Sequence, residues 1–125
     1  MLQTLSTATA QKGETSWDIY PRPQLRRNSY VNLNGQWNFA LSPSPDFPAA
    51  SEETIPAPSC PASTPSGVKN AVETGSYLFY RRELTLPTDF NRGRVMLHIG
   101  AADQVADVYV NQQLMGHHEG GYNAF

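Results

Sequence analysis

The chain has 125 residues, a net charge of −2 and 16% charged residues, so it forms one domain at most and has no basic excess for binding nucleic acid. No apolar run approaches the roughly 20 residues of a membrane-spanning helix. Ten prolines, nine glycines, six tyrosines and five phenylalanines are typical of an all-β domain with irregular connections.

Residues 1–16 are small and polar, and they predict a flexible N-terminal arm ahead of a domain that spans residues 17–125. The arm begins with neither a basic region nor a solid apolar stretch, so it does not resemble a secretory signal peptide. Cys60 is the single cysteine. One thiol cannot form a disulfide within the fold, which favours a reducing compartment and the cytoplasm over secretion.

The first strand is predicted to follow a tight turn at Asn34-Gly35, two residues that tolerate positive φ. Trp37, Phe39 and Leu41 then alternate with small or polar residues. A period of two with polar partners indicates a strand that is buried on one face.

A long loop is expected between residues 42 and 76, because this segment holds seven of the ten prolines and has no sustained periodicity. Ile55 and Val68 are its candidate anchors on the sheet. The next strand is predicted over residues 77–86, and it ends at Pro87, which has no N–H to donate to a neighbouring strand.

Arg82 lies on the face of this predicted strand that otherwise carries leucine and tyrosine side chains. A buried guanidinium needs a carboxylate partner, because the loss of its hydration is costly. We therefore predict a structural ion pair between Arg82 and either Asp103 or Asp107, and a ligand-binding pair is the alternative.

Two more strands are predicted at residues 95–99 and 106–110, where aliphatic residues alternate with others. Residues 111–113 form a hairpin turn that leads into a last strand at Leu114-Met115. No helical period of useful length occurs. The chain then ends where a strand would continue, so the sequence predicts an all-β domain that is incomplete at its C-terminus.

His117, His118 and Glu119 are the obvious candidates for a metal site. Neighbouring residues of a strand point to opposite faces, so these three side chains cannot converge on one ion. The sequence also has no Ser-His-Asp order, no His-Glu-x-x-His motif and no glycine-rich phosphate motif. We therefore expect no metal, no cofactor and no active site in this chain.

Four segments carry a resemblance to a known family. They are residues 27–39 (with Leu-Asn-Gly-Gln-Trp-Asn-Phe), residues 59–67, residues 80–87 (Tyr-Arg-Arg-Glu-Leu-Thr-Leu-Pro) and residues 95–125 (ending His-His-Glu-Gly-Gly-Tyr-Asn-Ala-Phe). In order and spacing they resemble the N-terminal sugar-binding domain of glycoside hydrolase family 2, the β-galactosidase and β-glucuronidase group. Each segment alone is a weak signal, and together they cover residues 20–125.

The resemblance implies a jelly-roll β-sandwich of the galactose-binding type, which precedes an immunoglobulin-like domain and a TIM barrel. Such enzymes hydrolyse β-glycosides with retention, through two glutamates about 5–5.5 Å apart in the barrel. Neither glutamate would lie in this chain, so its own role would be non-catalytic. The parent enzyme would act on terminal β-linked sugars, with β-galactosides ranked first and β-glucuronides second.

The resemblance also implies that the segment after the last hairpin leads toward the mouth of the barrel. His118 or Glu119 would then contact the sugar or the domain interface, and a solvated turn or a domain-packing contact is the alternative. Among the aromatic residues, Tyr122 is the candidate for an exposed ring that stacks on a sugar. Gln112 stands where the family has glycine, so the hairpin turn is expected to be wider than in the family.

The expected partners are carbohydrate, the downstream immunoglobulin-like and TIM-barrel domains, and a second copy in a homo-oligomer, with no nucleic acid and no membrane. Two other functions stay open, a free-standing carbohydrate-binding module and a structural β-sandwich that binds partners but no sugar. A sandwich without its last strands would expose apolar surface and strand edges, and we expect it to associate in isolation.

Overall fold

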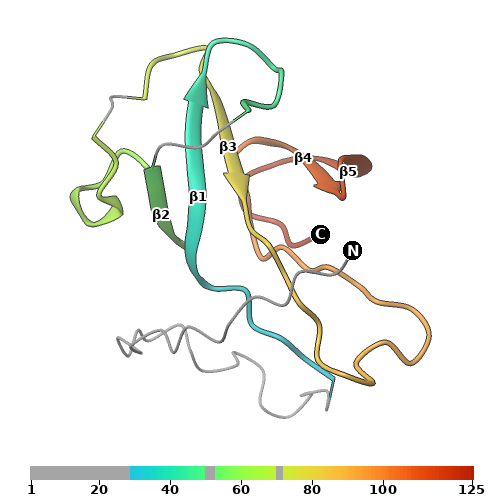
Figure 1. The fold of residues 1–125 in the computed structure, drawn as a ribbon. Helices are drawn as coiled ribbons and strands as arrows, with labels where there is room; N and C mark the ends of the chain where they lie inside the picture. Colours follow the sequence, from blue (N-terminus) through green and yellow to red (C-terminus); the bar gives the residue numbers. More distant parts are fainter. Residues whose placement is uncertain (1–28, 50–52, 70–71) are drawn as a thin grey trace. The chain divides into compact units, whose positions relative to one another are not determined.

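The computed structural model describes residues 29–49, 53–69 and 72–125, and the chain divides into two compact units at the Leu86–Pro87 boundary. Each unit is built from antiparallel strands (Figure 1). Within the described residues, the one helical element is the short 3-10 turn η2 (Thr64–Ser66). The predicted all-β class is therefore confirmed. The predicted arm, residues 1–16, lies outside the described residues.

The first unit contains a three-stranded sheet in the order β2-β1-β3. The central strand β1 (Gly35–Ser42) pairs with β2 (Glu53–Ala57) on one side and with β3 (Tyr77–Arg81) on the other (Figure 1). Gly35 has a φ of 119°, a conformation that side chains with a Cβ rarely adopt, so glycine suits the entry to β1. The strand predicted after Asn34-Gly35 is confirmed.

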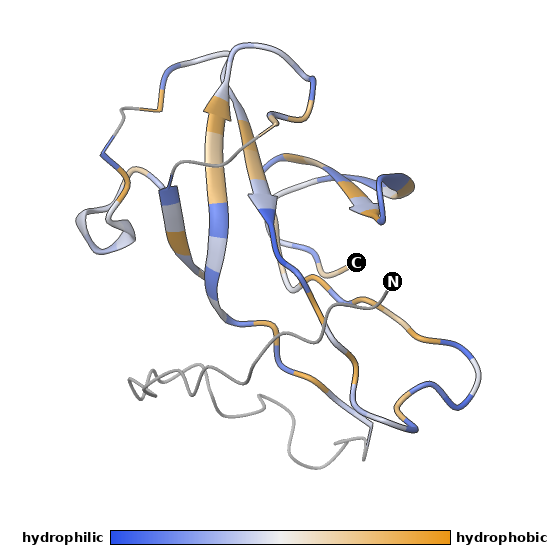
Figure 2. Cartoon of the chain, in the orientation of Figure 1, coloured by the Kyte–Doolittle hydropathy of each residue, from blue (hydrophilic) through white to orange (hydrophobic). Residues whose placement is uncertain are grey.

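The core of this sheet is formed by the apolar face of β1. Along β1, the hydropathy changes from mainly hydrophilic near Gly35 to hydrophobic toward the end of the strand (Figure 2). Phe39 and Ile55 are 1% and 0% exposed. Phe39 lies opposite Tyr80 in the register, and the two rings pack edge to face with centroids 5.2 Å apart. This pair joins β1 to β3 through side chains as well as backbone hydrogen bonds.

The long segment between β1 and β3 is not a continuous loop, because it contains β2. The prediction missed this strand since Pro56 interrupts its pattern. Pro56 is tolerated because β2 is at the edge of the sheet, where a missing N–H need not break a ladder. Ile55 anchors the segment as predicted, since it lies opposite Trp37 and is fully buried.

The strand predicted over residues 77–86 is shorter in the structure. Pairing with β1 ends at Asn38 opposite Arg81. Arg82, the next residue, is exposed, and its Nη1 donates hydrogen bonds to the carbonyls of Leu33 and Asn34, at 2.6 and 3.2 Å. Residues 82–86 alternate correctly for a strand but have no neighbouring strand in the described part of this unit.

The second unit is a β-hairpin with flanking segments. Strand β4 (Val105–Val110) pairs with β5 (Gln113–Glu119), and Val110 lies opposite Gln113. The turn thus has only two residues, Asn111 and Gln112, with φ values of 50° and 67°. Both predicted strands are confirmed, and the expectation of a wider turn was wrong, because Gln112 adopts the left-handed conformation that glycine usually supplies.

The strand predicted at residues 95–99 is reduced to one residue pair. The N–H and C=O of Ile99 exchange two hydrogen bonds with those of Phe125, at 2.8 and 3.0 Å. Such an exchange is one hydrogen-bonded pair of an antiparallel ladder. Val95, Met96 and Leu97 are all exposed, so the apolar pattern that predicted a strand is not covered within this unit.

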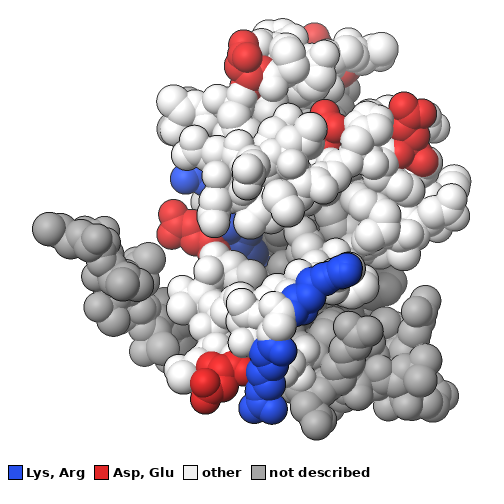
Figure 3. Space-filling model, turned by 90° about the vertical axis from the view of Figure 1, so that its right-hand side faces the viewer, with Lys and Arg blue, Asp and Glu red and all other residues white. Residues whose placement is uncertain are grey.

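Charged side chains are dispersed over the surface. On the face drawn in Figure 3 they form small groups of either sign within a mostly uncharged surface. The dispersed pattern agrees with the small net charge of −2.

The isolated chain is predicted to associate and to unfold without a sharp transition. In the part of the chain that the structure describes, Phe39 and Ile55 are the only buried apolar side chains, whereas Val105 and Met115 are each 64% exposed. Burial on this scale gives little stability. We expect binding of anilinonaphthalene sulfonate and concentration-dependent sedimentation. A monomer with a cooperative transition and a high midpoint would contradict this.

Gln112→Gly is predicted to stabilise the second unit by about 0.5–1 kcal/mol, because a left-handed conformation costs a non-glycine residue about 1–2 kcal/mol and glycine's extra chain entropy offsets part of the gain. The gain would be measured as slower amide hydrogen exchange in β4 and β5. Gln112→Ala is the matched control, since alanine keeps the unfavourable φ of 67°. An equal gain in both variants would mean that the glutamine side chain, and not its backbone, is unfavourable.

Candidate functional site

The residues proposed from sequence as sugar contacts all belong to the second unit and gather at the open end of its hairpin. His118 and Glu119 are the last residues of β5, and Tyr122 lies three residues beyond it. Both candidate aspartates also belong to this unit, since Asp107 is on β4 and Asp103 precedes it. The open end of the hairpin is therefore the candidate functional site.

A β-bulge decides which side chains meet across this hairpin. Tyr109 lies opposite Leu114, but the next pair is Val108 with Gly116, so Met115 is the extra residue of β5. Beyond the bulge, Asp107 lies directly opposite His117. Side chains of directly opposed residues share one face of the sheet. The bulge thus brings a carboxylate and an imidazole together on the same face.

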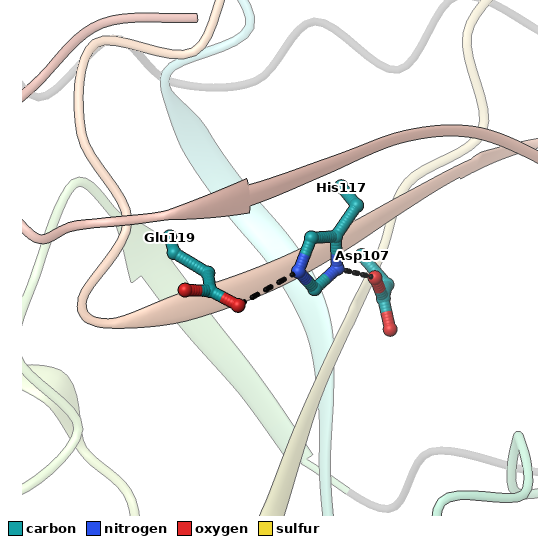
Figure 4. Close-up of polar contacts among 3 residues, drawn as sticks. All are labelled: Asp107, His117 and Glu119. Carbon is teal, nitrogen blue, oxygen red and sulfur yellow. Dashed lines mark hydrogen bonds and ion pairs between the residues drawn. The ribbon is translucent and has the colours of Figure 1, made fainter.

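His117 is held between two carboxylates (Figure 4). Its Nδ1 lies 2.6 Å from Oδ1 of Asp107, and its Nε2 lies 3.3 Å from Oε1 of Glu119. Asp107 is on the neighbouring strand, whereas Glu119 is two residues along β5 and so on the same face. The three side chains are well exposed, at 49%, 53% and 75% for Asp107, His117 and Glu119.

The two carboxylates raise the pKa of His117 above its ordinary value of 6.5. The hydrogen bond to Asp107 has the largest effect, and the hydrogen bond to Glu119 comes second; the charges of both carboxylates act in the same direction. Slight desolvation opposes them and lowers the pKa. The net effect is a pKa above 6.5, so His117 keeps its proton to higher pH than an ordinary histidine does.

His118 occupies the opposite face of β5. Its ring stacks on Phe125 with centroids 3.9 Å apart and planes 13° apart, and its Nε2–H donates to the carbonyl of Gly120 at 3.0 Å. Phe125 is itself held by the backbone pair with Ile99. His118 therefore supports the segment that follows β5. Its ring lies on the opposite face of β5 from the side chain of Glu119.

The segment after β5 is packed closely against the residues that precede β4. The N–H of Gly120 donates to the carbonyl of Gln104 at 2.6 Å. A Cβ placed on Gly121 would lie 2.6 Å from Oδ1 of Asp103, so a side chain there would require Asp103 to move. Tyr122, which follows these glycines, is 99% exposed. The tight backbone path thus presents an aromatic ring fully to solvent.

Arg82 belongs to the first unit, where its described contacts lie. Besides the two carbonyls, its guanidinium carbon lies 5.8 Å from the centre of the Trp37 ring, within cation–π range. The predicted ion pairs of Arg82 with Asp103 or Asp107 would join the two units, and they stay a prediction. Carbonyl oxygens and an aromatic face already stabilise this exposed cation without a carboxylate.

The described residues contain no group of three potential ligands arranged to hold a metal ion. Asp107 and Glu119 illustrate the reason, because they contact opposite nitrogens of one imidazole and so cannot meet at a common ion. Among the same residues, no helix is long and apolar enough to cross a bilayer.

The sequence named His117 only as part of a metal site that was rejected, and it did not predict the contact of His117 with Asp107. A two-residue turn without a bulge would place Asp107 opposite Gly116, and His117 on the other face. The signal that could have found the contact is Gly116, since glycine within a strand often accompanies a bulge.

No protein-family model matches the sequence, and no curated protein matches it significantly. The assignment of a function to this chain therefore depends on the motifs and on the geometry of the hairpin.

The second unit is predicted to lose stability as the pH rises through the folded pKa of His117. Folding raises this pKa, so the contribution of His117 is fully present below about pH 6.5, its unfolded value, and disappears above the folded value. Amide hydrogen exchange of β4 and β5 between about pH 5.5 and pH 8.5, corrected for the intrinsic exchange rate, would measure it.

Asp107→Asn should flatten this pH dependence, because it removes the strongest hydrogen-bond partner of His117. His98→Gln removes the other exposed histidine of the unit and should leave the pH dependence unchanged. An unchanged slope in Asp107→Asn would mean that another group controls the stability.

Proposed function

We propose that this chain is a non-catalytic sugar-binding and scaffolding domain of a retaining β-glycosidase of glycoside hydrolase family 2, with a jelly-roll sandwich of the galactose-binding type. The observation that carries the proposal is the 99% exposed ring of Tyr122 at the open end of the hairpin, three residues beyond Glu119. The four sequence segments that resemble the family support it.

The chemistry of this end of the hairpin suits a carbohydrate. An exposed tyrosine ring can stack on the apolar face of a pyranose, and its hydroxyl can hydrogen-bond at the same time. The carboxylate of Glu119, 75% exposed, can accept hydrogen bonds from sugar hydroxyls. In this proposal Tyr122 and Glu119 contact the sugar, and His118 positions them through its stack on Phe125.

The hydrolytic reaction itself belongs to the rest of the proposed enzyme. Retaining hydrolysis needs two carboxylates about 5–5.5 Å apart, one as nucleophile and one as acid and base. The family resemblance assigns both to a TIM barrel beyond an immunoglobulin-like domain, and this chain would brace the barrel and form one wall of its pocket. β-Galactosides are the first candidate substrates, and β-glucuronides are the second.

The reading frame downstream of the Phe125 codon tests the assignment to a larger enzyme. A frame that continues into a sandwich and a barrel with two glutamates at strand ends would support it. A stop codon directly after Phe125 would exclude hydrolysis by this chain and leave the binding proposal to be tested alone.

A structural interaction domain is the second candidate, and the exposed apolar residues of the hairpin favour it. Val105, Leu114 and Met115 are each more than half exposed. Exposed apolar side chains of this size often mark protein contacts. In this alternative the hairpin would pack on a protein partner and bind no sugar.

Tyr122→Ala is predicted to weaken binding of methyl β-galactoside by about tenfold, which corresponds to about 1.4 kcal/mol of lost contact. Ligand-observed NMR would measure the affinity, and methyl β-glucuronide would test the second substrate class. Tyr77→Ala is the matched control, since Tyr77 is an exposed tyrosine of β3 in the other unit. A folded chain that binds neither glycoside would favour the interaction domain.

A further inference from the structure

The contacts of His117 with Asp107 and Glu119 depend on how many protons the imidazole carries. An imidazolium ion donates from both nitrogens, so it can hold Asp107 and Glu119 at the same time. A neutral imidazole donates from one nitrogen only. The contact with Asp107 is the shorter, at 2.6 Å against 3.3 Å for Glu119, so Nδ1 is the nitrogen that keeps its proton.

Loss of the other proton reverses the interaction with Glu119. The lone pair of Nε2 then faces the Oε1 oxygen of a carboxylate, and two acceptors repel each other. Glu119 is the most exposed of the three side chains, so it can rotate into solvent at little cost. Asp107 stays in place through its own hydrogen bond.

Few other groups on this face of the hairpin can influence the contact between His117 and Glu119. From β4, the side chains on the same face as His117 are Asp107, the phenol of Tyr109 and the apolar Val105; from β5 they are Glu119 and the apolar Leu114. The charged neighbours of His117 on the hairpin are therefore the two carboxylates that it contacts.

We propose that His117 is a proton-controlled latch on Glu119, which holds this carboxylate along β5 when the imidazole is protonated and releases it for ligand binding when the imidazole is neutral. The identity of the ligand, a sugar hydroxyl pair, rests on the proposed function. The latch makes affinity for a neutral sugar increase as the pH rises through the titration of His117.

Side-chain NMR of the whole chain tests the latch without any ligand. The carboxyl carbon of Glu119 should shift with the same midpoint as the ring of His117, and that midpoint should lie above 6.5. Asp107→Asn should lower the midpoint of both signals together. His117→Thr, a strand-favouring change on an exposed face, should abolish the Glu119 step. His98→Gln should change neither.

A Glu119 signal that keeps its step in His117→Thr, or that titrates apart from His117 in the parent chain, would overturn the latch. If His117→Thr unfolds the hairpin, Asp107→Asn still decides the test. The latch requires the His117 and Glu119 signals to share one midpoint that moves in this variant, and separate midpoints refute the latch.

Binding of methyl β-galactoside across the same pH range separates this proposal from the proposed function. Coupled titration without sugar binding at any pH leaves the latch standing and refutes the sugar site. Sugar binding whose affinity does not follow the His117 midpoint, with no coupled titration, refutes the latch and leaves the sugar site standing.

Discussion

The extra residue in β5, Met115, is the constraint on which the candidate site depends. Side chains alternate between the two faces of a strand, so an insertion of one residue exchanges the faces of everything beyond it. Because of this shift, Asp107 and His117 meet and His118 turns to the other side, onto Phe125. Without the bulge, His118 would lie on the same face as Asp107, and Asp107 would lie opposite Gly116.

A comparable role in the first unit belongs to the carbonyl of Leu33. It accepts hydrogen bonds from the indole of Trp37 at 2.8 Å and from the guanidinium of Arg82 at 2.6 Å. Arg82 is 49 residues away in sequence, so this one acceptor ties the entry of β1 to the end of β3. Gly35 follows this carbonyl by two residues, and its positive φ lets the chain turn into β1.

The alternation of apolar and polar residues correctly predicted the strands in which that alternation is clear. Trp37, Phe39 and Leu41 marked β1, and Val108 and Val110 marked β4. The same rule failed in both directions elsewhere: Pro56 hid β2, and residues 95–99 alternate well but pair only at Ile99. Alternation reports which face of a segment could be buried, whereas a strand also requires a neighbour with free hydrogen-bonding groups.

The two faces of the hairpin have different physical characters, and this difference limits what each can do. One face is half-buried, with Ala106, Val108 and His118 and with Phe125 stacked on the imidazole. The other exposes two carboxylates and an imidazole that is shared between them. Substitutions on the first face therefore change the position of the loop that carries Tyr122, whereas substitutions on the second change the charge that a ligand meets. Because the charged face is open to solvent, salt weakens its interactions, and they add little to the stability of the hairpin. In the proposed latch, their main effect is to determine the pH at which Glu119 is available to a ligand.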